Sequence, residues 1–501
     1  MTRHPGLSKS RIIIHRQCPR RLWLQVYRPE LAVVEKAATE MMATGRRVGE
    51  VARTLFPNGL LMPEGDLKQA RWETDAALAL RPRRPLFEAT FSHQQVLVQA
   101  DILYPAGNGY RMAEVKAANE VKEYHYDDAA VQAWVIRQAG VRLHRVEICH
   151  LNRDYIYPGG DNWHGLFALS DITSEVKDRR KAIPTWVSDA QRTLGQTVQP
   201  RVQTGVQCRQ PFACPFFTHC EPNAIAELRP CDLQVLPRAG SLVTMLRESG
   251  FTSLKDVPPE KLNNPVQQRI RRTLIANRAE IDPVAGEILG GLPYPRYYLD
   301  FETMQFAIPF WIGTSPYAQI PFQWSCHVEK RAGGKLREHS FLADGANNPC
   351  RELTENLLAA VGKMGPIFVY SSFEQSRLKN LASQYPDLAP AIEKVMKRLV
   401  DLLPITKKYY YHPDMRGSWS LKAVLPTIAP DLDYSNLPVA DGLMAQEAFQ
   451  EIMRPETKVR RRNQLRRQLV EYCGLDTLAL VRLVHFFMEA SASCRRKSTR
   501  P

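Results

Sequence analysis

Residues 297–303 read Tyr-Tyr-Leu-Asp-Phe-Glu-Thr, an aromatic and aliphatic run that follows Pro293 and Pro295 and is typical of a buried strand. Asp300 and Glu302 stand two positions apart, and side chains at i and i+2 of a strand share one face. Two carboxylates on one buried face repel each other unless a cation compensates them. The sequence therefore predicts a site for a hard divalent cation such as Mg²⁺, suited to phosphodiester chemistry. The alternative is an edge strand whose acids face water.

The composition of the whole chain restricts its class and its partners. The chain has 501 residues, 44% hydrophobic and 24% charged, which predicts a folded protein of two or three domains. Its formal net charge of +15 is spread over many basic clusters and predicts a polyanionic partner, namely nucleic acid. The sequence contains no uninterrupted apolar run of about 18 residues and no N-terminal secretory segment. We therefore expect a cytoplasmic protein without a membrane partner.

The N-terminal third contains three predicted strands, the last two joined by Gly-Asn-Gly in a hairpin, at residues 85–91, 96–104 and 110–116. Opposed residues in a hairpin have position numbers with a constant sum. If Gly-Asn is the turn, the sum is 215 and Asp101 faces Glu114, whereas an Asn-Gly turn gives 217 and sets Asp101 opposite Lys116. Both registers place all three side chains on one face, with opposed Cβ atoms about 4.5–5.5 Å apart. The two acids could share Mg²⁺ or Mn²⁺, and Lys116 could orient a water or stabilise transition-state charge. The alternative is a surface hairpin with a cross-strand salt bridge.

Clustered cysteines are interpreted as metal ligands, because ten cysteines in a chain expected in the cytoplasm should not form a disulfide framework. Cys208, Cys214 and Cys220 lie within thirteen residues, in a loop broken by prolines and aromatics. Three thiolates lack a fourth partner for tetrahedral zinc or for a [4Fe–4S] cluster, and Cys18 could supply it. Five residues separate Cys208 from Cys214 and five separate Cys214 from Cys220, a spacing that does not resemble a zinc knuckle. We therefore expect an iron–sulfur cluster, with zinc as the alternative.

The C-terminal half alternates strands and helices, which predicts a mixed α/β sheet. The expected elements are strands at residues 322–328, 339–341 and 367–370 and a helix at 351–362. Glu374 follows the last of these strands, near the sheet edge where ligands tend to bind. Tyr472 and Asp476 stand one turn apart on a long amphipathic helix. Between the two halves, a basic helical stretch around Arg269, Arg271 and Arg272 is either a phosphate contact or a spacer.

A set of residues in the N-terminal third resembles the PD-(D/E)XK nucleases of the RecB and CRISPR-associated exonuclease type: Glu88, Asp101, Glu114-Val115-Lys116 and Gln132. The resemblance implies that the three acids bind metal, that Lys116 is the motif lysine and that Gln132 is the glutamine of the following helix. It also implies that Cys18 and the cysteine triplet hold an iron–sulfur cluster that joins the ends of the domain. Many relatives carry a further histidine ligand on an early helix, where this chain offers only Glu50.

A second set, in the C-terminal half, resembles the tyrosine variant of the DEDD exonucleases of RNase H-like fold: Asp300, Glu302, Glu374, Tyr472 and Asp476. The resemblance implies a 3′–5′ exonuclease site in which the four acids hold two cations, Mg²⁺ or Mn²⁺, and Tyr472 orients the attacking water. Glu374 stands where many relatives have aspartate, and Asp401 is the other candidate for the third acid.

The order of these modules resembles, over nearly the whole chain, a bacterial family of unknown function that fuses a RecB-like iron–sulfur nuclease module to a DEDD-type module. It implies an α/β multidomain fold in four parts. These are a restriction-endonuclease-like domain with an iron–sulfur staple at residues 1–225, a helical connector at 226–290, an RNase H-like domain with a mixed sheet at 291–490 and a basic tail at 491–501.

The expected function is that of a metal-dependent nuclease with two potential active sites, acting as an exonuclease on single-stranded or end-exposed DNA rather than RNA. One alternative keeps a single active centre and uses the other domain as a nucleic-acid clamp. The other is a non-catalytic nucleic-acid-binding or interaction protein built on degenerate nuclease folds.

Overall fold

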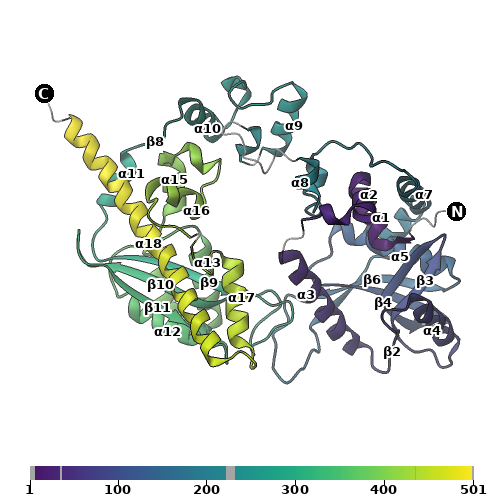
Figure 1. Cartoon of the computed structure of the whole chain (residues 1–501). Helices are drawn as coiled ribbons and strands as arrows, with labels where there is room; N and C mark the ends of the chain where they lie inside the picture. The colour runs from purple at the N-terminus through teal and green to yellow at the C-terminus, as the bar shows by residue number, and fades with distance from the viewer. Residues whose placement is uncertain (1–5, 34–35, 222–231, 238, 435, 499–501) are drawn as a thin grey trace. The chain divides into compact units, whose positions relative to one another are not determined.

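The computed structural model describes residues 6–33, 36–221, 232–237, 239–434 and 436–498 (Figure 1). The chain divides into two compact units, one comprising Met1–Ala226 with Phe306–Ala318 and the other Glu227–Gln305 with Gln319–Pro501. Each unit is built on a mixed β-sheet with helices packed on it. The prediction of a multidomain α/β protein with mixed sheets is therefore confirmed.

The sheet of the first unit has seven strands in the order β2-β3-β4-β5-β6-β7, with β1 paired to β4. The strands are β1 (Leu7–Ser8), β2 (Leu60–Leu61), β3 (Leu86–His93), β4 (Val96–Ala106), β5 (Gly109–Lys116), β6 (Leu143–Leu151) and β7 (Phe167–Asp171). Strands β3, β4 and β5 are the three predicted strands and form an antiparallel meander that includes the predicted hairpin, whereas β5 and β6 are parallel. A parallel pair needs a crossover, and α5 (Glu123–Gln138) supplies it.

Helix α5 is buried from Ala129 to Ile136 and occupies the centre of the first unit's core, together with the inner face of β3 and β4. The other helices of this unit are α1 (Lys9–Gln17), α2 (Pro19–Tyr27), α3 (Lys36–Ala52), α4 (Leu67–Ala79), α6 (Thr173–Arg179), α7 (Ile183–Leu194) and α8 (Phe217–Cys220). Ser8 begins α1 as its N-cap, its hydroxyl accepting a hydrogen bond from the backbone N–H of Arg11 at 3.3 Å. The segment Phe306–Ala318 also belongs to this unit: the Tyr317 hydroxyl donates to the carbonyl of Ala117 at 2.8 Å.

The sheet of the second unit has five strands in the order β11-β10-β9-β12-β13. They are β9 (Arg296–Met304), β10 (Ile320–Glu329), β11 (Arg337–Leu342), β12 (Ile367–Val369) and β13 (Leu399–Asp401). Strands β9, β10 and β11 are antiparallel to one another, and β12 runs parallel to both β9 and β13. Strand β9, which carries Asp300 and Glu302, is therefore the central strand, and the alternative of a solvated edge strand is wrong.

Both faces of this sheet are covered, which explains why β10 is buried at every position. The Gln323 amide donates to the carbonyl of Leu469 on α18 (Val459–Ser498), whereas the Trp324 indole donates to the carbonyl of Leu353 on α12 (Cys350–Ala360). Because consecutive strand residues point to opposite faces, α18 and α12 cover opposite sides. The helices between β12 and α18 are α13 (Phe373–Gln384), α14 (Ala389–Met396), α15 (Leu402–Tyr409), α16 (Leu421–Ile428) and α17 (Gly442–Met453).

Helix α18 crosses one face of the sheet and is the longest helix of the described chain (Figure 1). Its part Val459–Cys494 is the one described helical stretch long and apolar enough to cross a membrane by length and composition. Its apolar residues are used inside the unit, where Leu469, Cys473, Leu480 and Phe487 are buried. The helix extends through Ser498 and so includes most of the stretch expected to be a basic tail, while residues 499–501 lie outside the described part.

The described part of the predicted connector packs into the core of the second unit. It contains α9 (Gly240–Glu248), α10 (Pro265–Ala276), β8 (Glu280–Ile281) and α11 (Val284–Gly290), and β8 pairs with β14 (Tyr410–Tyr411). Arg269 and Arg272 form ion pairs with Glu280, and Arg271 donates to the carbonyl of Lys255. These guanidinium groups have partners within the protein, which favours the spacer interpretation over a phosphate contact.

Candidate active centres and cysteine pocket

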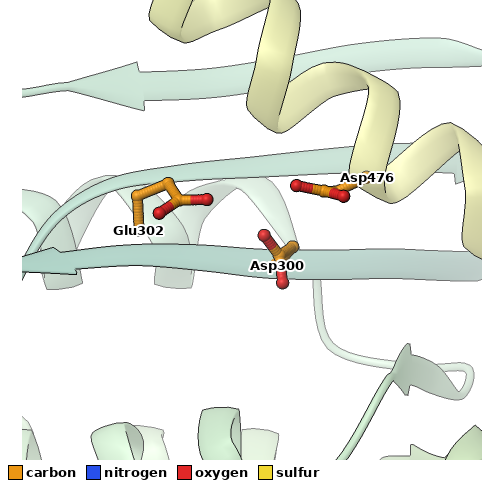
Figure 2. Close-up of side chains that lie close together, drawn as sticks. All are labelled: Asp300, Glu302 and Asp476. Carbon is orange, nitrogen blue, oxygen red and sulfur yellow. The ribbon is translucent and has the colours of Figure 1, made fainter. Parts of the chain in front are cut away.

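Three carboxylates meet where α18 crosses β9. One oxygen from each of Asp300, Glu302 and Asp476 lies within 4.8 Å of the others, and Figure 2 shows the acids of the strand facing the acid of the helix. Alternation along β9 puts Asp300 and Glu302 on the face that α18 covers, as the sequence predicted. No other group of three or more His, Cys, Asp or Glu ligand atoms in the described chain meets the same distance limit. The arrangement is suited to a divalent cation with oxygen ligands.

Glu374 joins this group from a third element. It is the second residue of α13, directly after β12, the strand that pairs with β9. The side chain is buried and its Oε2 has no hydrogen-bond partner, which leaves a ligand atom available. Burial raises the pKa of Glu374 to about 7 and a hydrogen bond with Asp300 opposes that shift, so the two side chains are in contact. We name Asp300, Glu302, Glu374 and Asp476 the C-terminal centre.

The other candidate for the third acid has a different role. Asp401 ends β13, next to β12, and its Oδ1 accepts a hydrogen bond from the backbone N–H of Leu403 at 2.9 Å. It is therefore the N-cap of α15. Its charge raises the pKa of Glu374, whose side chain is hydrogen-bonded with Asp300, so the structure brings Glu374 into the centre and leaves Asp401 beside it.

The acids of the C-terminal centre bind protons unusually tightly. Burial raises the pKa of Glu302 to about 8 and that of Asp476 to about 6, and the charge of Asp476 adds to the shift of Glu302. The pKa of Asp300 lies well above its usual range because of burial and because of repulsion from Asp476, Glu374 and Glu302. Four carboxylates with so little positive charge among them fit divalent cations.

Two residues beside the acids were not assigned to this site from the sequence. The Tyr434 hydroxyl donates to Asp476 Oδ1 at 2.6 Å, inside the protein. The Lys422 ammonium lies 5.4 Å from the centre of the Tyr434 ring and 5.3 Å from that of Tyr472, and it donates to the carbonyl of Ala440. Neither residue belongs to a recognisable site pattern in the sequence, since Lys422 lies near the start of a helix and Tyr434 stands in a loop.

The N-terminal hairpin adopts one of the two predicted registers. Ile102 pairs with Ala113 and Leu103 with Met112, so the sum is 215 and Asp101 stands opposite Glu114. The backbone N–H of Val115 donates to Asp101 Oδ2 at 2.7 Å, which holds this carboxylate against β5. The two acids are thus neighbours, and Asp101 does not stand opposite Lys116.

Two lysines and a further acid complete this N-terminal centre, and sequence reasoning found only one of the three. Lys116 donates to Glu114 Oε1 at 2.9 Å and also to Asp128 of α5. Lys9, the first residue of α1, donates to the same Glu114 oxygen at 2.5 Å. Burial raises the pKa of Asp101 to about 8, whereas the two ammonium groups overcome burial and hold the pKa of Glu114 below its usual range.

Glu88 and Gln132 lie beside the N-terminal centre. Glu88 interrupts the pairing of β3 with β4 opposite Asp101, with a φ of 56°, a left-handed backbone that is uncommon for glutamate. Burial and the charge of Glu114 raise its pKa. Gln132 follows Asp128 by one helical turn, fully buried, and neither of its amide atoms has a hydrogen-bond partner. Glu50, in contrast, is exposed and pairs with Arg47.

The four predicted cluster cysteines line one pocket. Cys18, Cys208, Cys214 and Cys220 surround it together with Arg20, Arg21 and Phe216, and we call it the cysteine pocket. None of the described cysteines forms a disulfide. Burial raises the pKa of the Cys214 and Cys220 thiols, and nearby Arg21 and Arg20, respectively, oppose that shift.

The spacing of the sulfurs bears on the choice between zinc and a cluster. Thiolates about 2.3 Å from one tetrahedral zinc ion are about 3.8 Å from each other. No three of these four described sulfurs lie within 4.8 Å of one another. A [4Fe–4S] cluster binds each thiolate through a separate iron, so its four thiolates lie further apart than those of a single zinc ion.

Comparison with known proteins yields a family and a relative without an assigned activity. Residues 297–420 match a family described as a domain of unknown function, DUF2779, which includes Asp300, Glu302 and Glu374 but ends before Asp476. A stretch of 213 residues is 25% identical to the uncharacterized protein MG366 of Mycoplasma genitalium, covering 39% of this chain and 32% of that protein. The chain thus spans about a third of the length of that relative.

Neutralising one acid of the C-terminal centre should stabilise the cation-free protein at alkaline pH. The folded pKa of Glu302, about 8, exceeds the unfolded value of about 4, so the folded state retains a proton that the unfolded chain has lost. The contribution of protonated Glu302 to the free energy of unfolding is therefore fully present below the unfolded pKa and is lost as the pH rises towards 8. We expect Glu302→Gln to raise the free energy of unfolding by about 2 kcal/mol at pH 8.5 and by little at pH 4. Thermal denaturation in a chelator measures this, with Glu393→Gln at an exposed site as the control.

Removing the Tyr434 hydroxyl should make Asp476 a poorer ligand at low pH. Tyr434→Phe leaves the Asp476 carboxylate without its 2.6 Å hydrogen bond, which raises its pKa further. We expect the pH at which half of the Mn²⁺ is bound to rise by about one unit, as 1.4 kcal/mol of lost stabilisation corresponds to one pKa unit. Electron paramagnetic resonance titrations between pH 5 and 8 test this, with Tyr409→Phe as the control. An unchanged pH midpoint of Mn²⁺ binding would contradict the assignment of Tyr434 to the C-terminal centre.

Proposed function

We propose that this protein is a metal-dependent nuclease that hydrolyses phosphodiester bonds of nucleic acid. The observation that carries the proposal is the convergence of Asp300, Glu302 and Asp476, joined by Glu374, on the central strand of a mixed sheet. The order of these acids along the chain and their placement on β9, α13 and α18 support an RNase H-like exonuclease of the DEDD type. Mg²⁺ or Mn²⁺ at this centre would supply an activated water and stabilise the leaving oxygen.

The side chains around the acids suit the handling of a phosphodiester. Tyr434 holds Asp476 by its hydrogen bond and so fixes one carboxylate of the centre. Lys422 is exposed at the centre's edge, and its charge lowers the pKa of Glu302 and Asp476, so a phosphate entering there would meet a cation. Tyr472 lies next to Tyr434, with the two ring centres 6.3 Å apart, and its buried phenol is suited to orienting a water through its hydroxyl.

The first unit supports a second nuclease centre of the PD-(D/E)XK type. Asp101 and Glu114 are opposed across the hairpin, and the free Glu114 Oε2 fits a divalent cation. Lys116, bridging Glu114 and Asp128, would orient the water or stabilise the charge that develops on the phosphate. A [4Fe–4S] cluster in the cysteine pocket would join α1 and α2 to the end of the unit, as in the RecB-like nucleases.

The substrate we propose is single-stranded or end-exposed DNA in the cytoplasm. The net charge of +15 supports a polyanion, and the resemblance of both units to exonucleases supports a strand with a free end. DNA is favoured over RNA because the RecB-like resemblance extends to the cysteine pattern.

A specific observation favours a second candidate, in which only the C-terminal centre is catalytic. Glu114 already has two ammonium partners, Lys9 and Lys116, so the N-terminal centre needs a cation less than the C-terminal centre does. The first unit would then hold nucleic acid without cleaving it.

Nuclease assays with single variants should separate these two possibilities. We expect the wild type with Mn²⁺ to degrade labelled single-stranded DNA faster than duplex DNA or RNA. Asp476→Asn and Lys116→Met should each lower a distinct part of that activity, on the order of 100-fold for the reaction of the centre they affect. The control for Lys116→Met is Lys68→Met, which changes an exposed lysine of the first unit. If Lys116→Met has no effect, only the C-terminal centre is catalytic. The nuclease proposal is lost if wild type and an Asp300→Asn, Lys116→Met double variant degrade all substrates equally slowly.

The cysteine pocket has its own test. Protein purified without oxygen should be brown and absorb in the visible iron–sulfur range, and Cys214→Ser should lose that absorption. Iron and zinc are measured on the same samples, with Cys494→Ser at an exposed site as the control. One zinc per chain and no visible band in the wild type would overturn the cluster assignment.

A further inference from the structure

We propose that Lys9, paired with Glu114, lowers the affinity of the N-terminal centre for a divalent cation, and that the cysteine pocket, at the other end of the same helix, holds Lys9 there. The inference rests on the proposed function of the N-terminal centre. It assigns a role to Lys9, which lies outside the Glu114-Val115-Lys116 motif that suggested the N-terminal centre. It also connects the N-terminal centre and the cysteine pocket, both in the first unit, through α1.

Lys9 and Lys116 bind the same oxygen of Glu114. Their Nζ atoms lie 2.5 Å and 2.9 Å from Glu114 Oε1, and Lys9 Nζ is also 3.5 Å from Asp128 Oδ2. Glu114 Oε2 is buried without a hydrogen-bond partner. The two lysines therefore hold the carboxylate in one orientation and leave a single oxygen for a divalent cation shared with Asp101.

The position of Lys9 is determined first by its own end of α1. The preceding strand β1 pairs in parallel with β4, Leu7 against Val96, and Ser8 caps the helix. Lys9 thus starts a helix that is held against the same sheet that carries Asp101.

The far end of α1 is fastened to the cysteine loop. The Gln17 amide donates to the carbonyl of Gln207 at 2.7 Å and to that of Phe212 at 2.6 Å, on either side of Cys208. The next residue, Cys18, is the C-cap of the helix, and its backbone N–H donates to the carbonyl of Ile14. Cys18 also lines the cysteine pocket. A helix of nine residues is about 13 Å long and moves as a rigid rod.

The two sites are therefore mechanically connected. When the cysteine pocket is filled, Cys18 and the cysteine loop are held together, and α1 keeps Lys9 on Glu114. When the pocket loses its contents, the Gln17 contacts lose their support and Lys9 is free to leave Glu114. The contents of the cysteine pocket thereby set how strongly the N-terminal centre attracts a divalent cation.

Removing Lys9 should tighten Mn²⁺ binding, which a merely structural role would not do. The Asp300→Asn protein serves as background, so that titration reports the N-terminal centre. Loss of a positive charge beside Glu114 should lower the Kd for Mn²⁺ about tenfold in Lys9→Met, since charges a few ångströms apart near a protein surface interact by more than 1.4 kcal/mol. Lys9→Arg should restore the original Kd within about threefold. A Kd that is unchanged or weaker in Lys9→Met overturns the role of Lys9.

The link to the cysteine pocket is tested by a double-mutant cycle. Cys214→Ser should lower the Kd for Mn²⁺ in the same direction as Lys9→Met, and the two changes together should lower it no further. Additive effects overturn the link. Gln17→Ala breaks the same connection without touching a thiol and should reproduce the Cys214→Ser result, which keeps the test decisive if a cysteine variant does not fold.

Labelling of Lys9 provides a readout that requires neither metal binding nor catalysis. With a limiting acylating reagent, mass spectrometry should find Lys9 labelled several-fold more slowly than exposed Lys68 in the wild type. Glu114→Gln, Cys214→Ser and Gln17→Ala should each raise its labelling, whereas Cys494→Ser should not. If the Asp300→Asn protein binds no Mn²⁺ while Lys9 labelling responds as expected, the proposed N-terminal nuclease centre is wrong but the connection stands. If the rate of Lys9 labelling is unchanged by Cys214→Ser and by Gln17→Ala, the proposed connection between Lys9 and the cysteine pocket is wrong.

Discussion

The organisation of the second unit depends on the repulsion among four carboxylates held in one place. Glu302, Glu374 and Asp476 are buried, and Asp300 is partly buried between them. Each element that carries one of these acids is itself fixed by packing: β9 is the central strand, α13 follows the neighbouring parallel strand, and α18 covers the face on which the acids lie. The unfavourable charge is thus maintained by the burial of apolar surface around it. Such an arrangement is suited to a cation and costs stability without one.

The two centres differ in how much positive charge within the protein compensates the repulsion among their carboxylates. In the C-terminal centre Lys422 is exposed and lies beside the Tyr434 and Tyr472 rings, and the pKa values of Asp300 and Glu302 remain high. In the N-terminal centre two lysines contact Glu114 directly, and its pKa is low. Similar sets of acids can therefore differ in their need for divalent cations, because the number of built-in ammonium partners differs.

Local geometry also separates functional polar groups from structural ones in this chain. Asp401 and Glu374 both follow parallel strands of the same sheet, yet Asp401 caps a helix whereas Glu374 keeps a free buried oxygen. The arginines of α10 likewise have internal partners, whereas their sequence was compatible with either a phosphate contact or a spacer. In these comparisons, the acid with an unused buried oxygen is the candidate ligand, and the side chains with internal partners have structural roles.

The sequence by itself determined those features that follow from short-range periodicity. Alternation along a strand placed Asp300 and Glu302 on one face, the constant sum in a hairpin restricted Asp101 to facing Glu114 or Lys116, and helical spacing put Tyr472 beside Asp476. Only the tertiary structure decided the register of the hairpin, the approach of Lys9 and Asp128 to Glu114, and the hydrogen bond from Tyr434 to Asp476. The physical reason is that periodicity specifies the direction of a side chain within its own element, whereas contacts between distant elements depend on how their apolar faces pack.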